Sequence, residues 1–332
     1  MQKVSILHLI TSAKNASPFD VNMAYDAGFD RIMPYTNVAL NEVEALTQDA
    51  MFSRSPGGVK REALFFGGRD IHVALEMQKM AVLGMFTPFE MSTMADPSGA
   101  FTTAAAMIAK IDTHLKSNNQ TLSQQIIAIF GASGTVGSTS ALIAAAQGAT
   151  VQLVAHKDAA LMQAYADSLH EKYGFNYQVV DGTNHAAKTN VLNTTTVAIC
   201  AALAGLRVLE TTHFAQSKTL KIIADVNAVA PSGAAGVEVM SDGGLVADTQ
   251  IAGFGAMMIG QLKYKTQQKL LQNMLDSESP AHLDFNNAFE VARNIVMASA
   301  YKYYYCGTFC TCLRTCRKGL RLQCHRAGCL CR

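Results

Sequence analysis

Short apolar runs of strand length alternate with longer stretches of helical periodicity along most of the chain. In the first part of the chain, this pattern predicts strands at Val4–Ile10, Arg31–Tyr35, Glu62–Phe66 and Phe89–Met94. It predicts helices over Phe19–Gly28, Ile71–Val82 and Ala100–Leu115. Strands that alternate with helices are typical of a mostly parallel sheet covered by helices. The predicted fold class is therefore α/β.

A polar segment at residues 117–124 is the best candidate for a linker, and a second, clearer alternating series follows it. The predicted strands of this series are Gln125–Phe130, Thr150–Ala155, Asn176–Val180, Thr195–Ala201, Leu220–Val226 and Leu245–Ala252. The predicted helices are Ser138–Gln147 and Ala160–Tyr173, and then two long ones, Met257–Leu275 and Asn286–Ala300. The second series again predicts a sheet of parallel strands.

The loop between the first strand and the first helix of this second series is rich in glycine. It reads Gly-Ala-Ser-Gly-Thr-Val-Gly, which is a G-x-x-G-x-x-G order. A chain that turns sharply after a strand and approaches a pyrophosphate needs residues without a Cβ, and the next helix offers free N–H groups to the phosphates. A plain strand–turn–helix is the alternative, but the apolar strand before the loop and the Ala-rich helix after it favour dinucleotide binding. The expected phosphate-binding residues are Gly131, Ser133, Gly134, Thr135, Val136 and Gly137.

The residues that follow the later strands bear on which dinucleotide is bound. An acidic residue after the second strand would accept the ribose hydroxyls of NAD. The sequence has His156 and Lys157 there, and this pair can hold a 2′-phosphate, so NADP is favoured and NAD remains possible. Two solvated surface residues are the alternative. Ala201, Asp225 and Asn227 end later strands and are expected at the same sheet edge, although turn chemistry would also account for Asp225 and Asn227.

Several sequence blocks are more specific than the glycine loop when they are taken in order and spacing. The strongest are an Asp-x-x-Gly-x-x-Thr-Thr-Ala-Ala-Ala block that starts at Asp96 and an Ala-Asp-x-Asn-Ala block that contains Asp225. Further blocks lie at residues 18–28, 65–68 and 254–265. With these blocks the chain resembles the bacterial methylene-tetrahydromethanopterin dehydrogenases over roughly residues 15–300.

The resemblance implies two α/β domains with a cleft between them. Residues 1–116 would form a pterin-binding domain on which residues 254–300 pack, and residues 120–253 would form a Rossmann-like domain. The implied reaction is reversible hydride transfer from the methylene bridge of reduced tetrahydromethanopterin to NADP or NAD, which leaves a methenyl cation. The implied assembly is a homo-oligomer, a trimer or a hexamer. A cytoplasmic location is expected separately, because the first residues have one charge and too short an apolar stretch for a signal peptide.

This reaction needs no general base, because a nitrogen lone pair expels the hydride from the methylene carbon. The protein must align the two reactants, favour the developing positive charge and exclude water, so a sparse site without a metal is expected. Asp20 is the first candidate for a carboxylate there, with Phe19 against the pterin ring and Lys263 as a hydrogen-bond donor. Asp96 and Thr102 are further candidates. The alternatives are a helix-terminal charge for Asp20, a solvated lysine for Lys263 and a helix cap for Asp96.

Two other functions remain open from the sequence. One is a methylene-tetrahydrofolate dehydrogenase, since the reacting carbon is the same in both pterins. The other is an NAD(P)-binding sensor without turnover, which gains its support from the replacement of two glycines expected in the segment before Lys263. No apolar run approaches the ~18–20 residues that span a bilayer, so no membrane partner is expected.

The composition changes abruptly in residues 301–332. This tail holds seven of the eight cysteines, seven basic residues and no acidic residue, and without it the net charge changes from +2 to −5. The basic balance of the whole chain is therefore no evidence for a nucleic-acid partner. The cysteine spacing fits no paired zinc template. We interpret the tail as out of frame or disordered, and as dispensable for activity.

Overall fold

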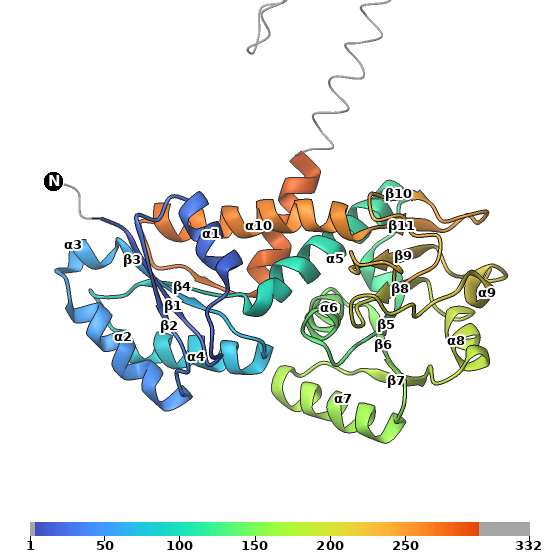
Figure 1. The fold of residues 1–332 in the computed structure, drawn as a ribbon, viewed down its shortest axis with the longest axis horizontal. Helices are drawn as coiled ribbons and strands as arrows, with labels where there is room; N and C mark the ends of the chain where they lie inside the picture. The colour runs from blue at the N-terminus through green and yellow to red at the C-terminus, as the bar shows by residue number, and fades with distance from the viewer. Residues whose placement is uncertain (1–3, 299–332) are drawn as a thin grey trace, which may run out of the picture.

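The computed structural model describes residues 4–298, which form two mostly parallel sheets with helices packed on them (Figure 1). The predicted α/β fold class is confirmed. The predicted tail at residues 301–332 lies outside the described residues, as do the last two residues of the final predicted helix.

The first sheet has the strand order β12-β4-β3-β1-β2, and every pair in it is parallel. Its strands are β1 (Ile6–Ile10), β2 (Arg31–Tyr35), β3 (Glu62–Phe66), β4 (Ser92–Ala95) and β12 (His282–Leu283). The helices of this region are α1 (Pro18–Asp26), α2 (Val43–Phe52), α3 (Pro56–Val59) and α4 (Ile71–Gly84). Asp70 caps α4, because its side chain accepts hydrogen bonds from the backbone N–H groups of His72 and Val73.

The second sheet has the order β10-β11-β9-β8-β5-β6-β7. Its strands are β5 (Ile126–Phe130), β6 (Thr150–Ala155), β7 (Gln178–Asp181), β8 (Val197–Cys200), β9 (Ile222–Asp225), β10 (Asp242–Leu245) and β11 (Ala252–Phe254). Its helices are α6 (Thr135–Ala146), α7 (Ala159–Tyr173), α8 (His185–Leu192) and α9 (Thr211–Phe214). The chain runs from β5 outward to β7 and then returns to β8 on the other side of β5. The strand order therefore reverses between β5 and β8, which is where such sheets bind ligands.

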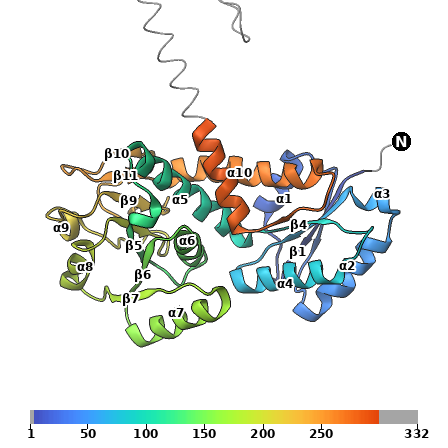
Figure 2. The same cartoon turned by 180° about the vertical axis from the view of Figure 1, so that it is seen from behind.

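Two long helices connect the sheets. Helix α5 (Ala100–Ser117) contacts α6 and α10, and helix α10 (Ala256–Asp276) contacts α1, α5 and β4. Residues 285–298 form a further helix. Figures 1 and 2 show α5 and α6 between the two sheets from both sides. This is the packing that the predicted division into two domains assumes, although the division itself stays a prediction.

The structure corrects one predicted strand. The segment Leu245–Ala252 is not a strand but mostly the turn between β10 and β11, which pair antiparallel. The Thr249 hydroxyl donates to the carbonyl of Val246 and accepts from the N–H of Ile251, and these bonds close the turn. Helices α2 and α3 and strand β12 were not predicted. Strand β4 begins three residues later than expected, since Phe89 closes a turn with Phe86.

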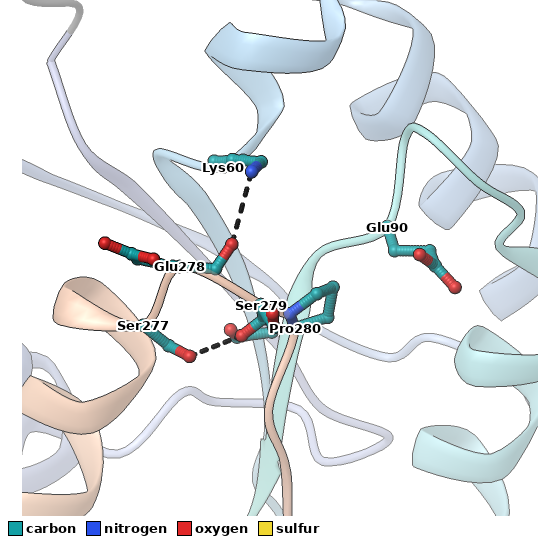
Figure 3. Close-up of a pocket in the computed structure, with 7 residues that line it drawn as sticks. Lys60, Glu90, Ser277, Glu278, Ser279 and Pro280 are labelled. Atoms are coloured by element: carbon teal, nitrogen blue, oxygen red, sulfur yellow. Dashed lines mark hydrogen bonds between the residues drawn. The ribbon is translucent and has the colours of Figure 1, made fainter.

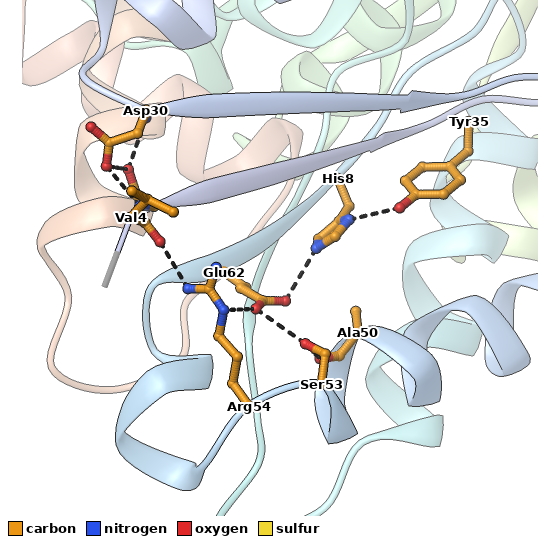
Figure 4. A network of polar contacts seen from close by, with 9 residues as sticks. Val4, His8, Asp30, Tyr35, Ala50, Ser53, Arg54 and Glu62 are labelled. Atoms are coloured by element: carbon orange, nitrogen blue, oxygen red, sulfur yellow. Dashed lines mark hydrogen bonds and ion pairs between the residues drawn. The ribbon is translucent and has the colours of Figure 1, made fainter. Parts of the chain in front are cut away.

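A buried ion pair organises the amino edge of the first sheet (Figure 4). The carboxylate of Glu62, the first residue of β3, is 2.5 Å from Nε of Arg54 and 3.1 Å from Nε2 of His8. His8 Nδ1 in turn contacts the Tyr35 hydroxyl at 3.1 Å. These contacts join the middle of β1, the end of β2 and the start of β3 to the segment that follows α2.

A small surface hollow lies at the same amino edge (Figure 3). It is lined by Lys60, Glu90, Ser92 and residues 277–280. The Lys60 ammonium donates to the carbonyl of Glu278 at 3.2 Å, which ties α3 to the segment after α10. None of its lining residues is a predicted site residue.

Candidate active site

The carboxyl edge of the first sheet gathers three polar segments. Gly67 directly follows strand β3, Asp96 directly follows strand β4, and Asp20 lies in the first turn of α1. A Cβ on Gly67 would lie 3.7 Å from Oδ2 of Asp20, so the Asp20 carboxyl sits against the end of β3. Ser17 caps α1 by accepting from the N–H of Asp20 at 3.4 Å, which fixes the start of the helix. Asp20 is 3% exposed although it bears a carboxyl group.

Helix α10 brings a lysine and a glutamine to Asp20. The Lys263 ammonium donates to Oε1 of Gln267 at 2.8 Å, one helical turn further along α10. The Gln267 amide Nε2 then donates to Oδ1 of Asp20 at 3.2 Å. Lys263 Nζ also lies 3.5 Å from the centre of the Phe19 ring, a distance typical of a cation–π contact. Four side chains from α1 and α10 thus form one continuous cluster.

Asp96 and Thr102 complete this cluster from the start of α5. Asp96 is fully buried and accepts from the N–H groups of Phe101 and Thr102 and from the Thr102 hydroxyl, the last at 2.6 Å. It therefore caps α5, which was the alternative considered for it. Gly99 has φ +64°, and a Cβ there would lie 2.8 Å from both Cε and Nζ of Lys263. A glycine at this position leaves room for the lysine against the start of α5.

Burial and mutual charge shift the titration of these groups. Burial, then the nearby Asp96 charge, raises the pKa of Asp20 from 3.8 to about 7, against opposing effects of Gln267 and Lys263. Burial also raises the pKa of Asp96, while Lys263 and the bonds from Thr102 oppose this rise. Burial lowers the pKa of Lys263, and the two carboxylates oppose the decrease. Asp20 is therefore placed to titrate near neutral pH.

The structure brings together all five residues that were expected at the pterin site, namely Phe19, Asp20, Asp96, Thr102 and Lys263. Their roles toward a substrate stay predictions. Gln267 was missed. Its spacing of four residues from Lys263 on a predicted helix was the available signal, because side chains at that spacing meet on one helix face.

The glycine loop lies at the reversal point of the second sheet. Gly131 has φ +83°, and a Cβ there would lie 2.6 Å from the carbonyl atoms of Ala201, at the end of β8. A Cβ on Gly137 would overlap the carbonyl oxygen of Gly131. The loop is thus closed so tightly that only glycine fits at both positions. Gly134 gives α6 no side-chain cap, so the first N–H groups, from Thr135, Val136 and Gly137, are available to an anion.

The two basic residues after β6 are exposed at the same edge, in a strand that pairs directly with β5. The following Asp158 accepts from the N–H groups of Ala160 and Leu161 and so caps α7. The Asp158 carboxylate therefore interacts with the start of α7. His156 and Lys157 therefore follow a strand end next to the glycine loop, as a site for a 2′-phosphate would require, and Ser133 of the loop is exposed.

Asp225 and Asn227 have partners within their own loops. Asp225 accepts from the N–H groups of Asn227 and Ala234, at 2.9 and 3.0 Å. Asn227 accepts from the N–H groups of Gly205 and Val229 and donates to the carbonyl of Pro231. Both side chains are buried and hold the loops after β8 and β9. The structure thus gives them the turn role that was the alternative, and contact with a cofactor stays a prediction.

Residues 4–298 contain neither a metal-binding cluster nor a membrane-spanning helix. No group of three or more His, Cys, Asp or Glu side chains in this range is placed to hold a metal ion. No helix in the described part of the chain is long and apolar enough to span a bilayer.

Known proteins with similar sequences match most of this chain. Residues 18–98 match the family described as methylene-tetrahydromethanopterin dehydrogenase, N-terminal. The chain is 28% identical over 296 residues to the bifunctional protein MdtA of Methylorubrum extorquens strain AM1, covering 89% of this chain and all of that protein (100%). Among solved structures, ornithine transcarbamoylase from Giardia lamblia has a TM-score of 0.50 and 9% identity, covering 84% of this chain and 88% of that one. At this identity the likeness concerns the fold alone.

A second relative decides the family. Over 292 residues, the chain is 38% identical to the NAD(P)-dependent methylenetetrahydromethanopterin dehydrogenase of Methylorubrum extorquens strain AM1. The alignment covers 88% of this chain and 98% of that protein. The chain belongs to the NAD(P)-dependent methylenetetrahydromethanopterin dehydrogenase family.

Proposed function

We propose that this chain transfers a hydride reversibly from the methylene bridge of methylene-tetrahydromethanopterin to NADP or NAD, giving methenyl-tetrahydromethanopterin. The observation that carries the proposal is the buried cluster of Asp20, Asp96, Lys263 and Gln267 at the carboxyl edge of the first sheet. Helix α5 begins at this cluster and packs on α6, the helix that begins at the glycine loop. The family relationship supports the same reaction.

The residues of the glycine loop fit a dinucleotide. Gly131 and Gly137 leave no space for a Cβ, and the start of α6 presents free N–H groups to the phosphates. Lys157 and His156 would hold a 2′-phosphate, which favours NADP. When bound, the nicotinamide supplies the hydride acceptor.

The cluster of Asp20, Asp96 and Lys263 would stabilise the positive charge that develops on the pterin. With Asp20 and Asp96 ionised and Lys263 protonated, the site carries a net charge of about −1. This charge favours the positive charge that develops as the methylene carbon loses its hydride. Phe19 is 45% exposed and offers an apolar ring beside Lys263, so it can pack against the pterin and help to exclude water.

A direct assay tests this proposal. Purified protein is mixed with methylene-tetrahydromethanopterin and either NADP or NAD, and the formation of reduced nicotinamide is followed by absorbance. Methylene-tetrahydrofolate serves as a parallel substrate. We expect turnover with the methanopterin compound. Turnover with the folate compound alone would move the enzyme to folate metabolism, and NADP binding without turnover on either would favour the sensor.

The preference for NADP has its own test in Lys157→Ala. The loss of a charge-assisted hydrogen bond to the 2′-phosphate is expected to raise KM for NADP about 10-fold and to leave KM for NAD unchanged. Lys218→Ala, which removes another exposed lysine of the same sheet region, is the matched control. Equal effects of Lys157→Ala on both cofactors would contradict this assignment.

The proposal also covers the cellular location of the enzyme and its oligomeric state. A cytoplasmic enzyme is expected, since its reaction draws on the pool of nicotinamide cofactors. A homo-oligomer, trimeric or hexameric, is expected from the family resemblance. Sedimentation of the purified protein measures the assembly directly.

A further inference from the structure

We propose that Gln267 is a positioning residue that fixes the orientation of the Asp20 carboxyl group and links it to the Lys263 ammonium. The inference rests on the proposed function, because it concerns the same site. It adds a residue that was not among the predicted site residues, and it assigns separate tasks to the two oxygens of Asp20.

The first support is the burial and bonding of the amide. The Gln267 side chain is fully buried, and both of its polar atoms have partners in the cluster. An ammonium group can only donate hydrogen bonds, so the atom facing Lys263 must be the amide oxygen. The amide nitrogen then faces Asp20 and must donate. The orientation of the amide is therefore dictated by Lys263, and it cannot be reversed without losing both bonds.

The second support is what this orientation imposes on Asp20. Oδ1 is always an acceptor, whether the carboxyl group is ionised or neutral, because Gln267 donates to it. A proton taken up by Asp20 must then reside on Oδ2, the oxygen that lies against Gly67 at the end of β3. Oδ2 is thus the oxygen that takes up and releases the proton. It is also the oxygen turned toward the carboxyl edge of the sheet.

The third support is that Gln267 stabilises the ionised form of the Asp20 carboxyl group. Its hydrogen bond lowers the pKa of Asp20 against the larger effects of burial and of Asp96. The charged groups that face Asp20 are Asp96 from the start of α5 and Lys263 from α10. A residue that only packs α10 on α1 would have no such effect on titration.

The chain offers a matched control beside Gln267. The amide of Gln268 also joins α10 to α1, by donating to the carbonyl of Asp26 at 3.3 Å, but it does not contact Asp20. Gln267→Met and Gln268→Met therefore both remove one bond between the same two helices. Only the first removes the donor from Asp20. Gln267→Glu is the second variant, since it keeps the side-chain length and an acceptor for Lys263 while it loses the donor.

The test measures kcat/KM for the methylene pterin from about pH 5.5 to about pH 9, because that profile reports the titrating groups of the free enzyme. We expect Gln267→Met to move the acid limb upward by about one pH unit, so that kcat/KM falls about 10-fold on that limb. Gln267→Glu is expected to move it further, since a second carboxylate then faces Asp20. Gln268→Met and NADP binding by all variants are expected to stay as in the parent.

A second readout does not depend on turnover. The Asp20 carboxyl carbon is titrated by ¹³C NMR in protein labelled at aspartate, with Asp20→Asn used to assign the signal. A midpoint that rises in Gln267→Met and stays fixed in Gln268→Met supports the proposal. An unchanged midpoint in Gln267→Met, or an equal rise in Gln268→Met, overturns it. Failure of the parent to oxidise either pterin would instead contradict the proposed function, and the NMR titration would still decide the role of Gln267.

Discussion

Replacing Asp20 with asparagine is expected to lower kcat/KM for the methylene pterin by about 100-fold to 1,000-fold, which is typical for the loss of one electrostatic group aimed at developing charge. The variant keeps the shape of the side chain and an oxygen for Gln267, but it removes the charge. Without that charge, Asp96 and Lys263 balance one another and the site no longer favours a cation. The affinity for NADP is expected to change little, because the glycine loop lies on the other sheet.

The pKa of Asp20 also predicts how kcat/KM of the parent enzyme depends on pH. Burial and Asp96 raise the pKa of Asp20 to about 7, so the carboxyl group is neutral below this value and ionised above it. The ionised form favours the cation, and kcat/KM for pterin oxidation should therefore rise with pH through about 7 and then level. In Asp20→Asn this limb should be absent. Asp26→Asn is the control, since Asp26 lies on the same helix and accepts from the Tyr264 hydroxyl of α10. An Asp20 variant that loses NADP binding as strongly as turnover would contradict the role assigned here.

Gly131→Ala is expected to weaken NADP binding more than about 10-fold, measured by the fluorescence of bound NADPH. The left-handed backbone costs a residue with a Cβ about 1–2 kcal/mol. The larger effect is the contact with the carbonyl atoms of Ala201 at 2.6 Å, which forces the loop away from the end of β8. The N–H groups at the start of α6 then lose their placement toward the phosphates.

Gly174→Ala separates these two effects. Gly174 also has a positive φ, +76°, but a Cβ there meets nothing within 4 Å. This variant should lose only about 1–2 kcal/mol of stability and keep its affinity for NADPH. Equal losses of affinity in the two variants would show that the contact with Ala201 is unimportant.

The sheets could be predicted from the sequence because their strands are short apolar runs between clear turn signals. Strands β2 and β3 have the predicted bounds. Helix α2 was missed, although its buried residues Val43, Thr47, Ala50 and Met51 follow the helical period. The hairpin of β10 and β11 was read as one strand, because the apolar residues in its turn resemble a strand until the bonds of Thr249 are known.

The candidate site could be predicted in its residue types but not in its connections. Asp20, Asp96 and Lys263 were found through sequence blocks far apart in the chain, and the structure brings them together. The role of Gln267 depends on helix α10 packing on α1, a contact between residues 247 positions apart that no local pattern reveals. The internal bonds of Asp225 and Asn227 likewise arise from loops that meet only in the folded chain.

The transfer of the hydride itself is measured most directly with an isotope label. A methylene bridge built from dideuterated formaldehyde and tetrahydromethanopterin is oxidised by the enzyme with NADP, and the reduced nicotinamide is analysed by mass spectrometry. We expect one deuterium in each reduced nicotinamide, and the same product at a far lower rate from Asp20→Asn. Reduced nicotinamide without the label would contradict direct transfer from the pterin carbon, and with it the proposed function.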